Sequence, residues 1–165
     1  MIRKNILIVP CLFILFTGCA KKLSYYAMPA PEMSSKLRVQ NQTNLLLNVQ
    51  PWSESKNCRG PLLVFPSTSN INFVPAKGET EYTISGGKEL SLLVAATSGI
   101  AQCTFYLTFF PEIKKDYQLS FSESKNENVC YVSMTERGRD GNANEISLKR
   151  RVGKIPFSDG GEWCE

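Results

Sequence analysis

The sequence of 165 residues contains no histidine. Without histidine the chain has no Ser-His-Asp or Cys-His nucleophile pair, no imidazole metal ligand and no general base of the commonest kind. The sequence also lacks a Cys-x-x-Cys pair, so the usual zinc-ligand spacing is absent. We therefore expect a protein that is not an enzyme and that needs neither a cofactor nor a metal ion.

A strong excess of charge and a membrane-spanning hydrophobic run are also missing. The chain holds 19 basic and 15 acidic side chains, a formal net charge of +4. A nucleic-acid-binding domain carries a much larger basic excess, so we expect no nucleic-acid partner. The longest apolar run is Ile6–Phe16. It is shorter than the roughly 20 residues that a membrane-spanning helix needs.

The beginning of the chain has the three parts of an export signal. Arg3 and Lys4 form a basic start, Ile6–Phe16 is the apolar middle, and small residues follow it. Phe16-Thr17-Gly18-Cys19 resembles the lipobox of bacterial lipoproteins, with Phe16 where leucine is usual. The resemblance implies removal of residues 1–18. It also implies that Cys19 receives a diacylglyceryl thioether and an amide-linked acyl chain such as palmitate. An ordinary secretory signal stays open as the alternative.

The lipoprotein resemblance implies a location in the bacterial cell envelope, with a lipid anchor at Cys19. Ala20, in place of the aspartate that retains enterobacterial lipoproteins, implies the outer membrane, facing the periplasm; surface exposure stays open. Residues 19–35 lack periodicity and contain Pro29 and Pro31, which predicts a flexible tether. We thus expect a signal peptide (1–18), a lipidated tether (19–35) and a folded domain (36–165).

From Lys36 onward, apolar and polar residues alternate as they do in β-strands. The clearest run is Ala101–Phe110, and strand candidates recur every 8–12 residues with turn signals between them. We predict an all-β domain, a single antiparallel two-sheet sandwich of the immunoglobulin-like or transthyretin-like kind. The expected strands include an opening hairpin from Leu37 to Val49 and further strands near Leu62–Phe65, Ile71–Phe73, Tyr82–Ile84, Leu90–Val94, Tyr117–Phe121, Cys130–Met134 and Ile146–Leu148.

Four cysteines remain once Cys11 leaves with the leader and Cys19 carries the lipid: Cys58, Cys103, Cys130 and Cys164. An even number in an exported chain predicts a disulfide-stapled domain, although sequence alone leaves three pairings open. We favour Cys58–Cys103 and Cys130–Cys164, because each closes a moderate loop and places one partner on a clear strand. A bridge to Cys164 would also hold the C-terminal tail and place Trp163 against a sheet.

Two groups of residues are candidates for a binding surface. Tyr106 and Phe110 alternate with the expected core residues of their strand, so they face the other way. Lys149, Arg150 and Arg151 form the most basic stretch, suited to anionic lipid or lipopolysaccharide phosphates, with a solvated strand end as the simpler reading. We expect a membrane-tethered module that binds an envelope protein or assists assembly. The alternative is a small-ligand, glycan or lysozyme-inhibitor-like binding lipoprotein.

Overall fold

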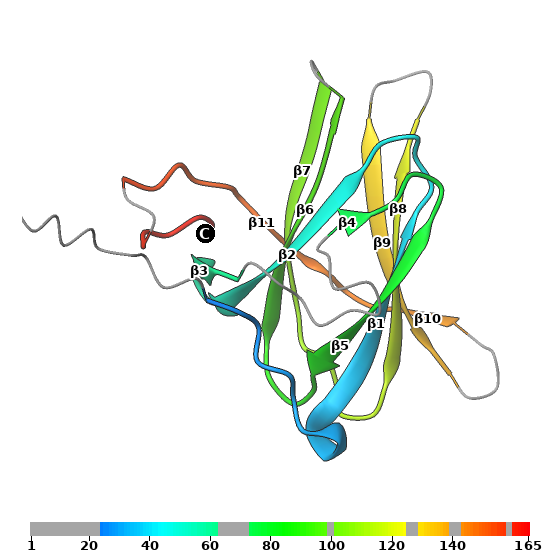
Figure 1. The fold of residues 1–165 in the computed structure, drawn as a ribbon, viewed down its shortest axis with the longest axis vertical. Helices are drawn as coiled ribbons and strands as arrows, with labels where there is room; N and C mark the ends of the chain where they lie inside the picture. The colour runs from blue at the N-terminus through cyan, green and yellow to red at the C-terminus, as the bar shows by residue number, and fades with distance from the viewer. Residues whose placement is uncertain (1–23, 63–72, 99–100, 125–128, 139–142, 158–159) are drawn as a thin grey trace, which may run out of the picture.

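The structure, a computed structural model, describes residues 24–62, 73–98, 101–124, 129–138, 143–157 and 160–165 (Figure 1). These residues form eleven strands and one short 3₁₀ helix. The elements are η1 (Pro31–Met33), β1 (Ser34–Asn41), β2 (Leu47–Glu54), β3 (Arg59–Pro61), β4 (Phe73–Val74), β5 (Glu79–Ser85), β6 (Leu90–Ser98), β7 (Ala101–Phe109), β8 (Asp116–Glu123), β9 (Cys130–Arg137), β10 (Ala143–Glu145) and β11 (Lys149–Arg151). Within the described ranges, no helix has the length and apolar character needed to cross a membrane.

The strands form two sheets that pack together, which confirms the predicted all-β sandwich (Figure 1). The first sheet has the order β10-β9-β8-β1-β5, and the second has the order β11-β7-β6-β2-β3, with β4 also beside β2. One pairing departs from the antiparallel pattern, because β1 runs parallel to β8, from Lys36 opposite Asp116 to Asn41 opposite Phe121. A parallel neighbour arises here because β1 and β8 are joined through the other sheet and not by a hairpin.

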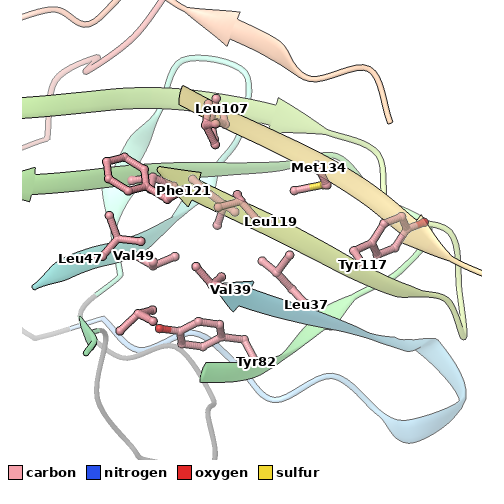
Figure 2. Close-up of a cluster of buried hydrophobic side chains, with 14 of the residues drawn as sticks. Leu37, Val39, Leu47, Val49, Tyr82, Leu107, Tyr117, Leu119, Phe121 and Met134 are labelled. Atoms are coloured by element: carbon pink, nitrogen blue, oxygen red, sulfur yellow. The ribbon is translucent and has the colours of Figure 1, made fainter. Parts of the chain in front are cut away.

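The core lies between the two sheets and follows the alternation read from the sequence. On β8, Tyr117, Leu119 and Phe121 are buried, and the residues between them are not. Figure 2 shows these side chains with Leu37 and Val39 of β1, all pointing into one apolar cluster. Aromatic contacts also join the two sheets. The ring of Phe105 on β7 lies 6.1 Å from that of Phe121 on β8, in an edge-to-face arrangement. The predicted strands at Tyr82–Ile84, Leu90–Val94 and Cys130–Met134 are confirmed as well.

The predicted opening hairpin from Leu37 to Val49 is wrong, because β1 and β2 belong to different sheets. The chain turns the corner after Asn41, whose side chain is buried. The Asn41 amide donates to the carbonyls of Leu45 (2.7 Å), Val74 (3.3 Å) and Pro75 (3.0 Å). Its oxygen accepts from the backbone N–H (3.0 Å) and hydroxyl (2.8 Å) of Thr43. The hydrogen bonds of this one side chain thus take the place of strand pairing where the chain passes from one sheet to the other.

We expect Asn41→Ala to lower the free energy of unfolding by about 2–4 kcal/mol, because it leaves several buried donors and acceptors without partners. Urea unfolding of the purified domain measures the change. Gln42→Ala is the matched control, since the Gln42 side chain is exposed and donates a solvent-exposed hydrogen bond to the side chain of its near neighbour Gln40 at 3.3 Å. An Asn41→Ala domain as stable as the control would show that the corner does not depend on this side chain.

The strand expected at Ile146–Leu148 is also corrected. These three residues form the link between β10 in the first sheet and β11 in the second. Ile146 and Leu148 pack against the core at half-buried positions, which explains their alternation. The Ile146 N–H still donates to the Met134 carbonyl of β9 at 2.9 Å, but the link does not continue as a strand. Of the expected strands near Leu62–Phe65 and Ile71–Phe73, residues 63–72 lie outside the described ranges, and Phe73–Val74 form β4.

All four expected cysteines are paired, but the favoured pairing is wrong. The disulfides join Cys58 to Cys164 and Cys103 to Cys130. Cys103 on β7 and Cys130 at the start of β9 lie in opposite sheets, with Cα atoms 6.2 Å apart, so their bridge staples the sandwich. The bridge from Cys164 holds the C-terminal segment to the β2–β3 turn. Loop length alone did not show which strands face each other across the core.

The N-terminal residues of the described chain are anchored ahead of the first strand. The Tyr26 hydroxyl donates to the Ser85 hydroxyl at 3.1 Å and accepts from the Ser85 backbone N–H at 2.8 Å. The Tyr26 ring also packs against the core. Fixed contacts therefore reach back to residue 26, inside the segment 19–35 that the sequence predicts to be a tether.

Candidate functional site

A charged groove of about 600 Å³ lies at one end of the first sheet, on its outer side. The inward residues Leu37 and Val39 leave Lys36 and Arg38 of β1 pointing outward. Arg38 lies opposite Glu81 on β5, and Lys36 lies opposite Asp116 on β8, so charged side chains of three strands meet there. The basic lining residues are Lys36, Arg38, Lys114, Lys115 and Arg137, and the acidic ones are Glu81, Asp116 and Glu136.

Glu81 is held as a carboxylate by two cations. Lys36 Nζ lies 3.1 Å from Glu81 Oε1, and Arg38 Nη2 lies 3.3 Å from Glu81 Oε2. The hydrogen bond from Lys36, supported by Arg38 and opposed by partial burial, lowers the pKa of Glu81 below its usual value. Arg38 Nε also lies 3.2 Å from Glu79 Oε1. Glu81 is therefore ionised at neutral pH and cannot serve there as a general acid.

The groups on the other wall of the groove, Lys115 and Tyr117, also keep one protonation state near neutral pH. Lys115 Nζ donates to Glu136 Oε1, and this bond raises the pKa of Lys115. Burial raises the pKa of Tyr117, whose hydroxyl accepts the backbone N–H of Glu112 at 2.8 Å. Lys115 thus stays an ammonium and Tyr117 a neutral phenol near neutral pH. Outside the lining, Glu79 pairs with Arg38 and Glu112 lies 3.9 Å from Lys115. Among the described residues, Lys114 and Arg137 are the lining cations without an ion pair, and they are suited to holding an anionic group.

We expect Glu81→Gln to lower stability at pH 7 by less than about 1 kcal/mol, because the ion pair is partly open to solvent. Since the folded pKa of Glu81 is depressed, its contribution is complete above the unfolded value of about 4.5 and is lost as pH falls through the lower folded value. Urea unfolding of wild type and variant at pH 7 and pH 3 measures this. A difference that persists at pH 3 would contradict the assignment.

Tyr106, expected at a binding surface, lies on the outer side of β7 under the C-terminal segment. Its ring lies 6.3 Å from that of Trp52, and both belong to a second apolar cluster with the Cys58–Cys164 disulfide. Gly153 sits so close that an added Cβ would come within 2.5 Å of the Tyr106 ring. Phe110, by contrast, is 60% exposed just after the end of β7.

The basic stretch Lys149–Arg151 forms β11, paired with β7, and its members point in different directions. Arg150 lies 5.5 Å over the ring of Phe105 and donates to the Val132 carbonyl in the first sheet. Arg151 donates to the Lys56 carbonyl on the outer side of the second sheet. Strand alternation therefore divides this stretch between two faces, and neither part contributes to the groove.

Trp163 packs against the second sheet, as we predicted from a disulfide at the neighbouring Cys164. Its ring lies 5.8 Å from that of Trp52 at the end of β2. The segment around it is hydrogen-bonded on both sides, with Trp163 N–H donating to Asn57 O at 3.2 Å and Lys154 N–H donating to Trp163 O at 2.8 Å. Sequence reasoning missed Trp52, although the alternation that points Leu47 and Val49 into the core places Trp52 on the opposite face of the same strand.

Neither the charged groove nor the second apolar cluster identifies a family. A scan against protein-family models gives no match for the chain, and a search of curated proteins finds no similar sequence.

Proposed function

We propose that this chain is a non-catalytic lipoprotein of the bacterial cell envelope, whose lipid-tethered β-sandwich binds a partner protein or acts as an assembly module. The observation that carries the proposal is Phe16-Thr17-Gly18-Cys19 directly after a basic start and a short apolar run. The two disulfides support it, because such bridges persist in oxidising compartments such as the periplasm.

The length of chain between the lipid site and the folded domain limits where a partner can be. Tyr26 is fixed to Ser85, and it lies only seven positions after Cys19. Even when fully extended, seven residues span no more than about 25 Å. A lipid on Cys19 would therefore keep the sandwich close to the bilayer, so the proposed partner is an envelope protein whose contact surface lies near the membrane.

The charged groove is the surface that best supports partner binding, because Lys114 and Arg137 are exposed and neither has an ion pair among the described residues. Exposed charges without an ion pair steer an oppositely charged surface into place and can pair with it there. An acidic segment of the partner protein fits this surface.

Affinity capture from detergent-solubilised envelopes tests the proposal. The bait is the full chain carrying a tag after Glu165, as wild type, as Lys114→Glu with Arg137→Glu, and as the control Lys77→Glu with Lys88→Glu. Both control lysines are exposed outside the charged groove. We expect one envelope protein to be recovered reproducibly with wild type and control and to be depleted with the groove variant. Failure of any bait to recover a reproducible partner would contradict the proposal.

A second candidate function is binding of a small anionic ligand or glycan, and the charged groove specifically favours it. Its volume of about 600 Å³ falls within the range of small-molecule sites. Titration of the ¹⁵N-labelled domain with tetragalacturonate should then shift the amide signals of Lys36 and Tyr117, and a lysozyme activity assay tests the inhibitor form of this function. Unchanged spectra and uninhibited lysozyme would count against the candidate.

A further inference from the structure

The C-terminal segment carries two large apolar side chains that are almost fully exposed. Ile155 is 96% exposed and Phe157 is fully exposed, with Pro156 between them. We call Ile155 and Phe157 the apolar tip. Exposed apolar side chains that gather on one protrusion mark a contact surface for another molecule or for a membrane.

The apolar tip projects from a base that is firmly held. Val152 and Glu165 exchange two backbone hydrogen bonds, of 3.1 and 3.0 Å, and the Cys58–Cys164 disulfide ties this base to the β2–β3 turn. Lys154 N–H donates to Trp163 O one residue before the tip. The exposure of Ile155 therefore belongs to an ordered protrusion and not to a frayed end.

Basic side chains surround the base of the apolar tip. Arg151 donates to the Lys56 carbonyl on the outer side of the second sheet, and Lys149 points to the same side as Arg151. Lys154 pairs with Glu165, and Arg59 pairs with Glu162 at 2.7 Å. Lys149 and Arg151 have no salt bridge among the described residues, so their charges stay available. An apolar tip within a basic collar is the composition of segments that bind anionic membrane surfaces.

The position of the N-terminal anchor also favours a membrane as the occupant. In Figure 1, the blue beginning of the described chain and the orange-to-red C-terminal segment both lie on the left side of the molecule, on either side of β3. The reach of about 25 Å from Tyr26 back to Cys19 would bring this side toward a bilayer that holds the lipid. This step rests on the proposed lipidation of Cys19.

We propose that the apolar tip is a second membrane contact. Ile155 and Phe157 enter the boundary between head groups and acyl chains of an anionic bilayer, and Lys149, Arg151 and Lys154 stay at the phosphates. The tip extends from the outer side of the second sheet, and the charged groove lies on the outer side of the first.

A fluorescence experiment tests where the apolar tip goes. It uses a chain that begins at Ala20, which has no lipid site but contains both sheets and both disulfides of the described fold. Ile155→Cys, labelled with an environment-sensitive NBD dye, should shift its emission to the blue with vesicles of equal phosphatidylglycerol and phosphatidylcholine. The control Ser133→Cys, exposed on the outer face of the first sheet, should show no shift. An unshifted dye at residue 155 would overturn the proposal.

Vesicle sedimentation of the same chain gives the second measurement. Ile155→Asp with Phe157→Asp should weaken binding to these vesicles at least about tenfold, since burial of one such side chain alone corresponds to that factor or more. Leu46→Asp with Phe110→Asp, which changes two exposed apolar residues elsewhere, should bind like wild type. Equal binding of both double variants, no binding of wild type, or capture of a protein by the tip without vesicle binding would overturn the proposal. Because Cys19 is absent from this shortened chain, such a failure would not bear on the proposed lipidation of Cys19. Fatty-acid labelling of the full chain tests that lipidation separately.

Discussion

Replacement of Cys19 by serine abolishes fatty-acid labelling of the protein in bacterial cells. The expected loss is complete, because the diacylglyceryl group is joined through a thioether and serine offers no thiol. Cells expressing the full chain are grown with radiolabelled palmitate, and the protein is recovered by immunoprecipitation. Three acyl chains, at about 0.8 kcal/mol for each buried CH₂, would also keep the wild-type protein in the membrane fraction through high-salt washes.

The matched control for this experiment is Cys11→Ser. Cys11 lies in the apolar run and leaves with the leader in the proposed processing, so its replacement should leave labelling unchanged. Removal of the leader should slow in the Cys19→Ser chain and proceed normally in the control. Labelling that survives in Cys19→Ser would refute the lipid assignment. Labelling lost in Cys11→Ser would mean that Cys11, and not Cys19, carries the acyl group.

Removal of the Cys58–Cys164 disulfide is the second change with a large expected effect. The bridge spans 106 residues, and the chain-entropy relation gives about 4.8 kcal/mol for a loop of that size. Small domains are stable by only about 5–15 kcal/mol, so Cys58→Ser with Cys164→Ser should remove between about a third and nearly all of the free energy of unfolding. The change also frees the segment that covers Trp52, so urea unfolding and a red shift of tryptophan emission both report it.

Cys103→Ser with Cys130→Ser is the matched comparison. This bridge spans 27 residues, for which the same relation gives about 3.6 kcal/mol, so this variant should be the more stable of the two. Peptide mapping under non-reducing conditions identifies the bridges in the wild-type chain. A peptide linking Cys58 to Cys103, or a larger loss of stability in the Cys103/Cys130 variant, would contradict the assigned pairing.

The strands of the core were predictable because burial leaves a local trace in the sequence. Tyr117, Leu119 and Phe121 alternate with polar residues, and the same pattern marks β5, β6, β7 and β9. A strand buried on one face must show this period, whichever strand it pairs with. The pattern therefore identifies which segments are strands and which side of each faces the core.

The connections between strands were not predictable, because they depend on contacts between residues far apart in the sequence. Asn41 looks like an ordinary turn residue until the carbonyls of Val74 and Pro75 are brought to its amide. The assignment of β1 and β2 to different sheets follows from that corner. The disulfide pairing depends on the same arrangement, since Cys103 and Cys130 meet only when their strands face each other across the core.

The charged groove was missed for a related reason. Lys36, Arg38 and Glu81 are each recognisable as outward-facing residues of a strand, but no local feature shows that they share one surface. Their meeting requires β1 to lie between β5 and β8, with the parallel register that places Lys36 opposite Asp116. The apolar tip, in contrast, lies in a segment without alternation, and only its exposure in the fold distinguishes it from a buried tail.

The mass of the mature protein, purified from membranes with detergent, tests the proposed anchor most directly. We predict an N-terminal peptide that begins at Cys19 and carries both the diacylglyceryl thioether and an acyl group on its amino nitrogen. A mature chain that begins downstream of Cys19, or one that begins at an unmodified Cys19 and is recovered in the soluble fraction, would contradict a lipid-anchored sandwich.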